Sequence, residues 1–373
     1  MDYIRTRNKN NIILYTNPFE DYNLLKNEIN KSITSTLDSG KYILGDNLNK
    51  FQIEFASYIG TKYSVGVASG TDAIFMSLKV LNIGRGDEVI TVSHTATATV
   101  SAIVATGATP ILVDINKDDF CMNLENLDKS ITKKTKAIIP VHLYGQMVNM
   151  KELIKISKKY KIDIIEDSSQ SHGASYDNKK SGSFGKLSCF SFYPTKNLGC
   201  YGDGGAITTN SKSLYNKLLM MREYGWKPKF NSISYGLNSR LDEIHASVLR
   251  IKLKKLDNFN YKRIKLADKY FNEIKNKKII LPKINNLNKH VFHLFVIRTN
   301  KRDELQKYLQ DNGIQTLIHY PLAPHKQEAY KEWKNEAYPI SEKVHDEVLS
   351  LPISGVQSLE DTKKIVQVIN SYE

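Results

Sequence analysis

One lysine and two adjacent carboxylates follow apolar segments of the sequence, where their side chains can meet. Lys196 follows the apolar run 187–192 and lies in a turn that contains a proline and a glycine. Glu166 and Asp167 end an earlier apolar run. A partly desolvated lysine amine can act as a nucleophile and a base, and a carboxylate can keep a pyridinium nitrogen protonated. These side chains therefore indicate Schiff-base chemistry, with either carboxylate as the partner of the ring.

Further polar residues have the types needed to bind a phosphate and a ring oxygen. Gly70 and Thr71 follow an apolar run and begin a helical pattern, where free backbone amides favour a phosphate. Ser191 lies shortly before the lysine, so its hydroxyl can reach the same phosphate. Gln170 comes one helical turn after Asp167 and can reach the ring oxygen. The alternatives are an ordinary capped turn at Gly70 and a helix cap at Asp167.

Short apolar runs alternate with helical patterns between about residues 60 and 225. The expected strands are Tyr63–Val67, Glu88–Val92, Pro110–Asp114, Lys136–Val141, Ile162–Glu166, Leu187–Phe192 and Gly205–Thr209. The expected helices between them are Thr71–Leu81, Thr95–Thr106, Met150–Tyr160 and Ser211–Tyr224. This alternation predicts an α/β fold with a mostly parallel sheet, in which ligands bind outside the carboxyl ends of the strands.

The remainder of the chain predicts a smaller α+β domain. Its expected elements are a long helix over Leu241–Asp257, a strand at Val291–Arg298, and helices at Asp303–Asn312 and Leu359–Ser371. We therefore divide the chain into residues 1–254, a large α/β domain with a surface arm before residue 20, and residues 255–373, the small C-terminal α+β domain.

Composition excludes several classes of protein. The chain has 53 Lys and Arg against 39 Asp and Glu, a formal net charge of +14, but its lysines are scattered as doublets over amphipathic patterns. That distribution favours a solvated surface over a nucleic-acid site. No apolar run approaches the length of a membrane helix. Cys121, Cys189 and Cys200 lack metal-site spacing and indicate reduced, buried thiols. We expect a cytoplasmic protein with no metal, membrane or nucleic-acid partner.

Five segments, in order, resemble motifs of the DegT/StrS-type sugar aminotransferases, which have the pyridoxal-phosphate (PLP) fold type I of aspartate aminotransferase. They are YILG at 42–45, SGTDA at 69–73, EDSSQSHGA at 166–174, FSFYPTKNLG at 190–199 and GLNSRL at 236–241. The resemblance covers nearly the whole chain. It implies a mostly parallel seven-stranded sheet, a smaller C-terminal α+β domain, and PLP as the cofactor.

The resemblance also implies roles for individual residues around the cofactor ring. Lys196 matches the lysine that binds the cofactor covalently and acts as the catalytic base. Asp167 matches the acid paired with the pyridine nitrogen, and Gln170 matches the partner of the ring hydroxyl. Only the resemblance separates Asp167 from Glu166. A few related dehydratases carry histidine at the lysine position, and this chain does not.

Other positions match the phosphate cradle and the second subunit. Gly70, Thr71 and Ser191 match residues that hold the phosphate. Asn238 matches a residue that reaches the phosphate from a second subunit, so the resemblance implies a homodimer with shared active sites.

One position departs from the family pattern. Many members have an aromatic residue after the threonine that begins the third helix, and this ring stacks on the cofactor. Here Thr95 is followed by Ala96. We therefore expect His94, or another group, at that face of the cofactor.

The segment around His94, together with residues 238–243 and 318–321, is most similar to members acting on dTDP-3-keto-6-deoxyhexoses. The implied reaction transfers an amino group from L-glutamate and gives a dTDP-3-amino-3,6-dideoxyhexose for lipopolysaccharide or another surface glycan. The residues expected to contact the substrate are Tyr193, Arg240, His319, Tyr320 and His325.

Three alternatives stay open at this point. The first is amination at C4 of a UDP-, GDP- or dTDP-linked 4-keto sugar, and the second is amination of a keto-cyclitol. The third is a catalytically idle relative that keeps the cofactor as a structural group in a regulatory protein. Arg222 and Arg240 are the candidates for binding the carboxylate of the amino donor.

Overall fold

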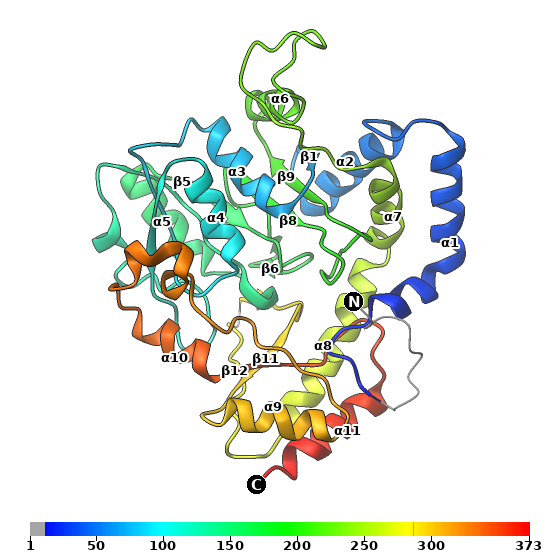
Figure 1. Cartoon of the computed structure of the whole chain (residues 1–373), viewed down its shortest axis with the longest axis vertical. Helices are drawn as coiled ribbons and strands as arrows, with labels where there is room; N and C mark the ends of the chain where they lie inside the picture. The colour runs from blue at the N-terminus through cyan, green and yellow to red at the C-terminus, as the bar shows by residue number, and fades with distance from the viewer. Residues whose placement is uncertain (1–11, 286) are drawn as a thin grey trace.

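A seven-stranded sheet forms the centre of the protein (Figure 1). The computed structural model describes residues 12–285 and 287–373. The strand order is β1-β9-β8-β5-β4-β2-β3. The strands are β1 (Tyr63–Val67), β2 (Glu88–Val92), β3 (Thr109–Val113), β4 (Thr135–Ile138), β5 (Asp163–Asp167), β8 (Leu187–Ser191) and β9 (Gly205–Thr209). These are the seven strands expected from the sequence, with ends that differ by up to three residues.

The sheet is parallel except for β9, which pairs antiparallel with both β1 and β8. The pairs β5–β8, β4–β5, β2–β4 and β2–β3 are parallel. The carboxyl ends of β5 and β8 therefore meet at one edge of the sheet, followed by the segments that contain Gln170 and Lys196. The expected α/β class with a mostly parallel sheet is confirmed.

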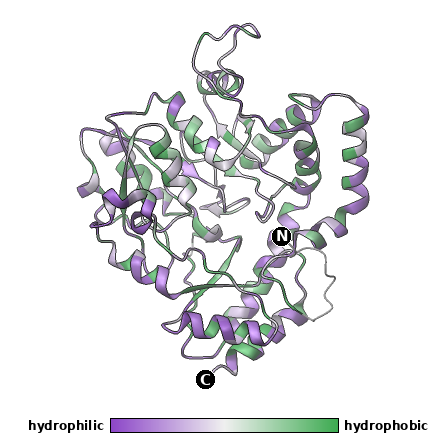
Figure 2. Ribbon diagram, viewed as in Figure 1, coloured by the Kyte–Doolittle hydropathy of each residue, from purple (hydrophilic) through white to green (hydrophobic). Residues whose placement is uncertain are grey.

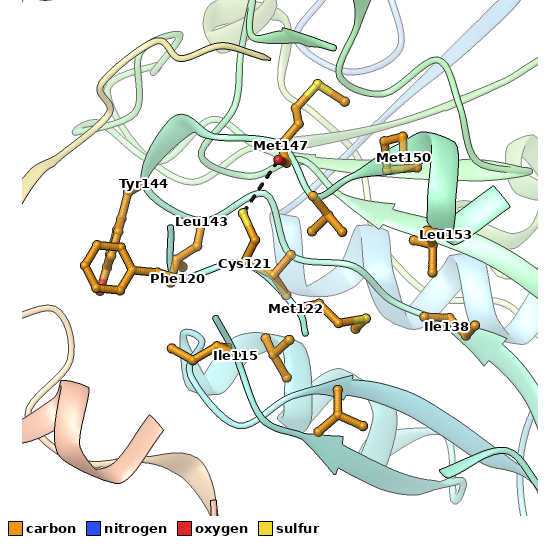
Figure 3. Packing of buried hydrophobic residues seen from close by; sticks show 14 of the residues in the cluster. Ile115, Phe120, Cys121, Met122, Ile138, Leu143, Tyr144, Met147, Met150 and Leu153 are labelled. Atoms are coloured by element: carbon orange, nitrogen blue, oxygen red, sulfur yellow. Dashed lines mark hydrogen bonds between the residues drawn. The ribbon is translucent and has the colours of Figure 1, made fainter. Parts of the chain in front are cut away.

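Helices cover both faces of this sheet. They include α3 (Gly70–Val80), α4 (Thr97–Ala105), α5 (Met150–Tyr160) and α6 (Lys212–Met221). Adjacent strand residues belong to different cores: Ile164 to one hydrophobic cluster and Ile165 to another. This alternation shows that the sheet is buried on both sides. Figure 3 shows part of the first cluster, where the Cys121 thiol lies 3.6 Å from the Met147 carbonyl.

The C-terminal region has its own hydrophobic core and lies below the large sheet in Figure 1. It contains α8 (Leu256–Glu273), the antiparallel pair β11 (Phe295–Arg298) and β12 (Val348–Leu351), α9 (Arg302–Asp311), α10 (Pro339–Glu347) and α11 (Leu359–Asn370). Ile13 joins this core and pairs with Ile314. Part of the expected N-terminal arm thus packs on the C-terminal region; its residues 1–11 lie outside the described residues.

Several helices differ from the sequence expectations. Two helices before the first strand, α1 (Pro18–Asp38) and α2 (Asp46–Ile59), were not expected. The expected long helix over Leu241–Asp257 is shorter in the structure, where it is α7 (Glu243–Leu253). The separate helix α8 begins at Leu256. Helix α1 has few buried residues and packs against α7. Because so few of its residues are buried, its sequence shows only a weak helical pattern of apolar residues.

The remaining elements are short. They are β6 (Ser175–Tyr176), β7 (Lys179–Lys180), β10 (Asn288–Lys289) and the 3₁₀ helices η1 (Leu127–Ser130), η2 (Leu143–Gly145), η3 (Pro324–Lys326) and η4 (Glu328–Trp333). Apolar and polar stretches alternate along the helices, as in amphipathic segments (Figure 2). Within residues 12–285 and 287–373, no helix combines the length and apolar character needed to cross a membrane.

Candidate active site

Lys196 lies in the loop between β8 and β9, just beyond the carboxyl end of β8. The next residue anchors this loop to the C-terminal region: the Asn197 side-chain amide donates to Asn260 Oδ1 at 2.8 Å and to the Val291 carbonyl at 3.0 Å. Burial lowers the pKa of Lys196 to about 8, although the negative charge of Asp167 opposes this shift. An amine with this pKa has an uncharged fraction near neutral pH, as a nucleophile or base requires.

Glu166 and Asp167 end β5 and have different surroundings. The Glu166 side chain is fully buried. Five protein groups donate to its two oxygens: His142 Nε2, the Ser188 hydroxyl, and the backbone amides of Gly182, Phe184 and Gly185. Burial alone would raise the pKa of Glu166, but the hydrogen bonds from His142 and the backbone outweigh it and lower that pKa. Protein groups therefore occupy the hydrogen-bonding capacity of this carboxylate.

The Asp167 side chain lies near Lys196. Its Oδ2 accepts a hydrogen bond from the Thr99 hydroxyl at 2.8 Å, and its Oδ1 accepts one from the Ser169 amide at 3.1 Å. Its negative charge is near enough to Lys196 to raise the pKa of the amine. Of the two carboxylates that the sequence left open, the geometry supports Asp167 as the one available to a ring nitrogen.

Gln170 is held by groups on both sides of its amide. Its Oε1 accepts from the Tyr144 backbone amide at 2.7 Å, and its Nε2 donates to the Tyr320 hydroxyl at 2.9 Å. A primary amide has two hydrogens, so this arrangement leaves one hydrogen of Nε2 for a ligand oxygen. Tyr320 was expected to contact the substrate; in the structure its hydroxyl positions Gln170.

The start of α3 and the end of β8 are in close contact. A Cβ atom at Gly70 would lie 2.7 Å from Ser191 Cβ, so only glycine fits there. Gly70 and Thr71 begin α3, and the Ser69 side chain caps the helix by accepting from the Asp72 amide. Free amides at a helix start beside a serine hydroxyl fit a phosphate group. The residues present therefore fit PLP: this cradle could hold its phosphate, and Lys196, Asp167 and Gln170 could serve its ring.

Three expected substrate contacts remain accessible. Tyr193 is 52% exposed, and Arg240 and His319 are partly exposed. Burial, followed by the charge of Lys196, lowers the pKa of His319 to about 4, so its ring is neutral. Tyr15 lies near both Tyr193 and His319, with its ring centroid 6.3 Å from that of His319. The sequence analysis did not identify Tyr15.

Two expected contacts lie in the interior instead. His94 has no exposed surface, and its ring nitrogens face His345 and the Tyr144 hydroxyl. His325 is also fully buried, and its Nε2 lies 3.0 Å from Glu342. Neither ring has a free face for a ligand, so we withdraw both from the expected site. Arg222, an open candidate for the donor carboxylate, is likewise buried.

The segment that follows α6 projects from the molecule (Figure 1), and Asn238 lies at its base. It pairs with Glu223 in an isolated bridge, and its side chain is exposed. The next residue fastens the base of this segment to the start of α3: the Ser239 hydroxyl donates to Asp72 Oδ2 at 2.6 Å.

Thr99 and Tyr144 are site residues that the sequence analysis missed. Thr99 lies in the first turns of α4 and bonds Asp167, whereas Tyr144 follows β4 and bonds Gln170. Tyr144 had a usable signal, because it follows a strand of the parallel sheet as Lys196 does. Thr99 had none, since it resembles the other small polar residues of its helix.

Comparisons with known proteins identify the family. The sequence matches the DegT/DnrJ/EryC1/StrS aminotransferase family over residues 23–370. It is 48% identical over 345 residues to a dTDP-3-amino-3,6-dideoxy-alpha-D-galactopyranose transaminase of Aneurinibacillus thermoaerophilus, covering 92% of this chain and 95% of that protein.

Solved structures show the same fold. The crystal structure of DesV from S. venezuelae in complex with a ketimine intermediate superposes with a TM-score of 0.94 at 40% identity, covering 96% of this chain and 98% of that one. NtdA from Bacillus subtilis with bound cofactor PMP has a TM-score of 0.86 at 32% identity, covering 92% and 80%. The chain therefore belongs to the DegT/DnrJ/EryC1/StrS aminotransferase family and is a nucleotide-sugar aminotransferase.

Proposed function

We propose that this protein transfers the amino group of L-glutamate to C3 of a dTDP-3-keto-6-deoxyhexose, giving a dTDP-3-amino-3,6-dideoxyhexose and 2-oxoglutarate, with PLP as cofactor. The observation that carries this proposal is the 48% identity, over nearly the full length, to a relative named for a dTDP-3-amino-3,6-dideoxygalactose. The placement of Lys196 beside Asp167 supports the transamination chemistry.

The chain's own residues have distinct tasks in this reaction. When bound, PLP supplies a cationic ring that withdraws electrons from the carbon losing a proton. Lys196 Nζ would hold the cofactor, and its uncharged amine would take a proton from the α-carbon of glutamate and return one to C3 of the sugar. The Asp167 carboxylate keeps the ring nitrogen protonated, and Thr99 holds that carboxylate in place.

Other residues would bind the phosphate group of the cofactor. Gly70, Thr71 and Ser191 would bind the cofactor phosphate, and the close approach of Gly70 to Ser191 supports this role. Asn238 would reach the cofactor phosphate held by a second copy of this chain. The projecting segment supports such a dimer, because it exposes Phe230 at 76% and Tyr235 at 98%, which is costly in water unless another surface covers them.

A direct assay tests the substrate. The holoenzyme is incubated with L-glutamate and, in parallel, with dTDP-3-keto and dTDP-4-keto 6-deoxyhexoses, and 2-oxoglutarate and the amino sugar are measured. We expect turnover with the 3-keto sugar and none with Lys196→Ala, which lacks the amine. Preferred turnover of the 4-keto sugar would replace C3 by C4 amination, whereas glutamate deamination without any sugar product would overturn the nucleotide-sugar assignment.

A further inference from the structure

A chain of three buried side chains connects the large domain to the segment that carries His319 and Tyr320. His345 on α10 has its Nδ1 2.7 Å from the Tyr320 carbonyl oxygen and its Nε2 2.9 Å from His94 Nδ1. His94 Nε2 lies 2.7 Å from the Tyr144 hydroxyl, which also donates to the His319 carbonyl. This series of hydrogen-bonded side chains thus begins and ends on the backbone carbonyls of two successive residues, Tyr320 and His319.

The number of hydrogens in this chain does not match the number of contacts. Each of the four contacts needs one hydrogen, and the two carbonyl oxygens supply none. A neutral imidazole carries one N–H and a tyrosine one O–H. The neutral His94, His345 and Tyr144 therefore provide three hydrogens for four contacts, whichever tautomers they adopt.

In the neutral state one contact must fail. In one arrangement Tyr144 donates to the His319 carbonyl, the N–H groups of His94 and His345 both point toward Tyr144, and the Tyr320 carbonyl faces a bare nitrogen. In the reverse arrangement His345 donates to the Tyr320 carbonyl and the His319 carbonyl loses its donor. In a third arrangement both carbonyls keep their donors, and the bare His94 Nδ1 faces the bare His345 Nε2 at 2.9 Å. One additional proton on the histidine pair completes all four hydrogen bonds.

We propose that His94 and His345 together hold one dissociable proton, and that this proton completes the hydrogen-bonded connection from the large domain through α10 to the segment 319–320. This connection has a consequence at the cofactor site. The Tyr320 hydroxyl accepts from Gln170 Nε2, so the attached segment fixes the direction of the Gln170 amide. This consequence for catalysis rests on the proposed function, whereas the proton itself does not. His94 and His345 are positioning residues, because neither has a free face for a ligand.

The charges around the pair are consistent with one proton and not two. Burial lowers the pKa of His94, and the charge of His345 lowers it further. Burial also lowers the pKa of His345, but the carbonyls of Tyr320 and Ser93 and the carboxylate of Asp346 favour its charged form. A second proton would place two cations in adjacent rings, which a buried site does not tolerate.

Several other polar groups lie near the pair. Burial raises the pKa of Tyr144, and it raises the pKa of Tyr320 to about 12, so both hydroxyls keep their protons. His319 is neutral, as described above. His325 opposes charge on His345 and is itself paired with Glu342, while Lys326 also contacts Glu342. Asp114, which follows β3, caps α10 by accepting from the backbone amides of Ile340 and Ser341. The apolar ring of Phe120 packs against Tyr144 (Figure 3).

Histidine NMR of the holoenzyme tests the proposal without substrate. Histidine Cε1 resonances are followed from pH 8 toward the acid limit of folding, and His94→Gln and His345→Gln assign the pair. We expect the two resonances to move in step with one midpoint and a total of one proton. His290 is an internal control, because burial lowers its pKa to about 3 and it should stay neutral. No protonation of the pair, or two independent protonations, would overturn the proposal.

The His345→Gln variant separates the proton from the packing. A primary amide carries two hydrogens on one nitrogen, so glutamine can donate to both the Tyr320 carbonyl and His94 without any charge. We therefore expect the kcat of the wild type to fall above the shared midpoint, and the kcat of His345→Gln to stay level there with KM unchanged. Equal pH profiles would contradict this positioning role. If the variant does not fold, the number of protons that the histidine pair binds in the wild type still tests the proposal. Absent turnover on every keto sugar, with the NMR result intact, would refute only the proposed function.

Discussion

The end of β5 carries two carboxylates in opposite surroundings. Glu166 is enclosed by five donors and holds the loop 182–185 and His142 against the strand. Asp167 has two protein donors and lies near the charge of Lys196. A carboxylate whose oxygens are fully occupied serves the fold, whereas one with remaining capacity can serve a ligand. The position of each side chain in the sheet decides its role, because successive residues of a strand point to opposite faces.

Asp167→Asn is the sharpest way to break this comparison. Asparagine keeps the shape and can accept from Thr99, but it loses the hydrogen bond from the Ser169 amide and removes the charge that holds the ring nitrogen protonated. We expect kcat to fall by about 10²–10⁴-fold, the range associated with a positioned acid or base. The melting temperature should fall less than it does for Glu166→Gln. Measured turnover close to that of the wild type would show that Asp167 is not the partner of the ring.

Glu166→Gln is the matched change on the other face. The new NH₂ group would face backbone donors and leave buried groups unpaired, so we expect a loss of about 3 kcal/mol in the free energy of unfolding. Because the folded-state pKa of Glu166 is lowered from 4.5, its contribution is present above that pH and is lost as the pH falls below it. Urea denaturation at pH 7 and at pH 4 measures both effects. A variant as stable as the wild type would contradict the structural role.

The pH dependence of cofactor capture sharpens the role of Lys196. Only the uncharged amine attacks an aldehyde, and the pKa of this amine is lowered to about 8. The rate at which the apoprotein captures PLP should therefore rise by about tenfold between pH 7 and pH 9 and then level off. Stopped-flow absorbance follows the capture. A rate that continues to rise through pH 10 would mean that burial does not lower this pKa.

Thr99→Val tests the support of Asp167 and has the smallest expected effect. Loss of one hydrogen bond to the carboxylate should lower kcat by roughly three- to tenfold, which corresponds to about 0.5–1.5 kcal/mol. The control is Thr106→Val at the end of the same helix, whose hydroxyl donates to the Ile103 carbonyl instead. Equal kcat values for the two variants would remove Thr99 from the site.

The sequence reached much of the site because strand ends in a parallel sheet are recognisable. Lys196, Asp167 and Ser191 each follow or end an apolar run that is a strand in the structure. Gly70 was found because glycine at a helix start signals a close approach, and the structure shows that approach to Ser191. Tyr15 and Thr99 could not be found in this way, since their neighbours in space are far away in the chain.

The sequence by itself determined the α/β class, the strands of the large sheet, the family and the lysine-centred chemistry, because strand periodicity and motif order are local properties. Only the tertiary structure showed that Glu166 is enclosed by five donors while Asp167 is not, and placed His94 and His325 in the interior. It also joined His94 to His345, which is far away in the chain, in a network that lacks one hydrogen. These outcomes depend on which atoms meet across the fold, and the pattern of residues along the chain does not specify such contacts.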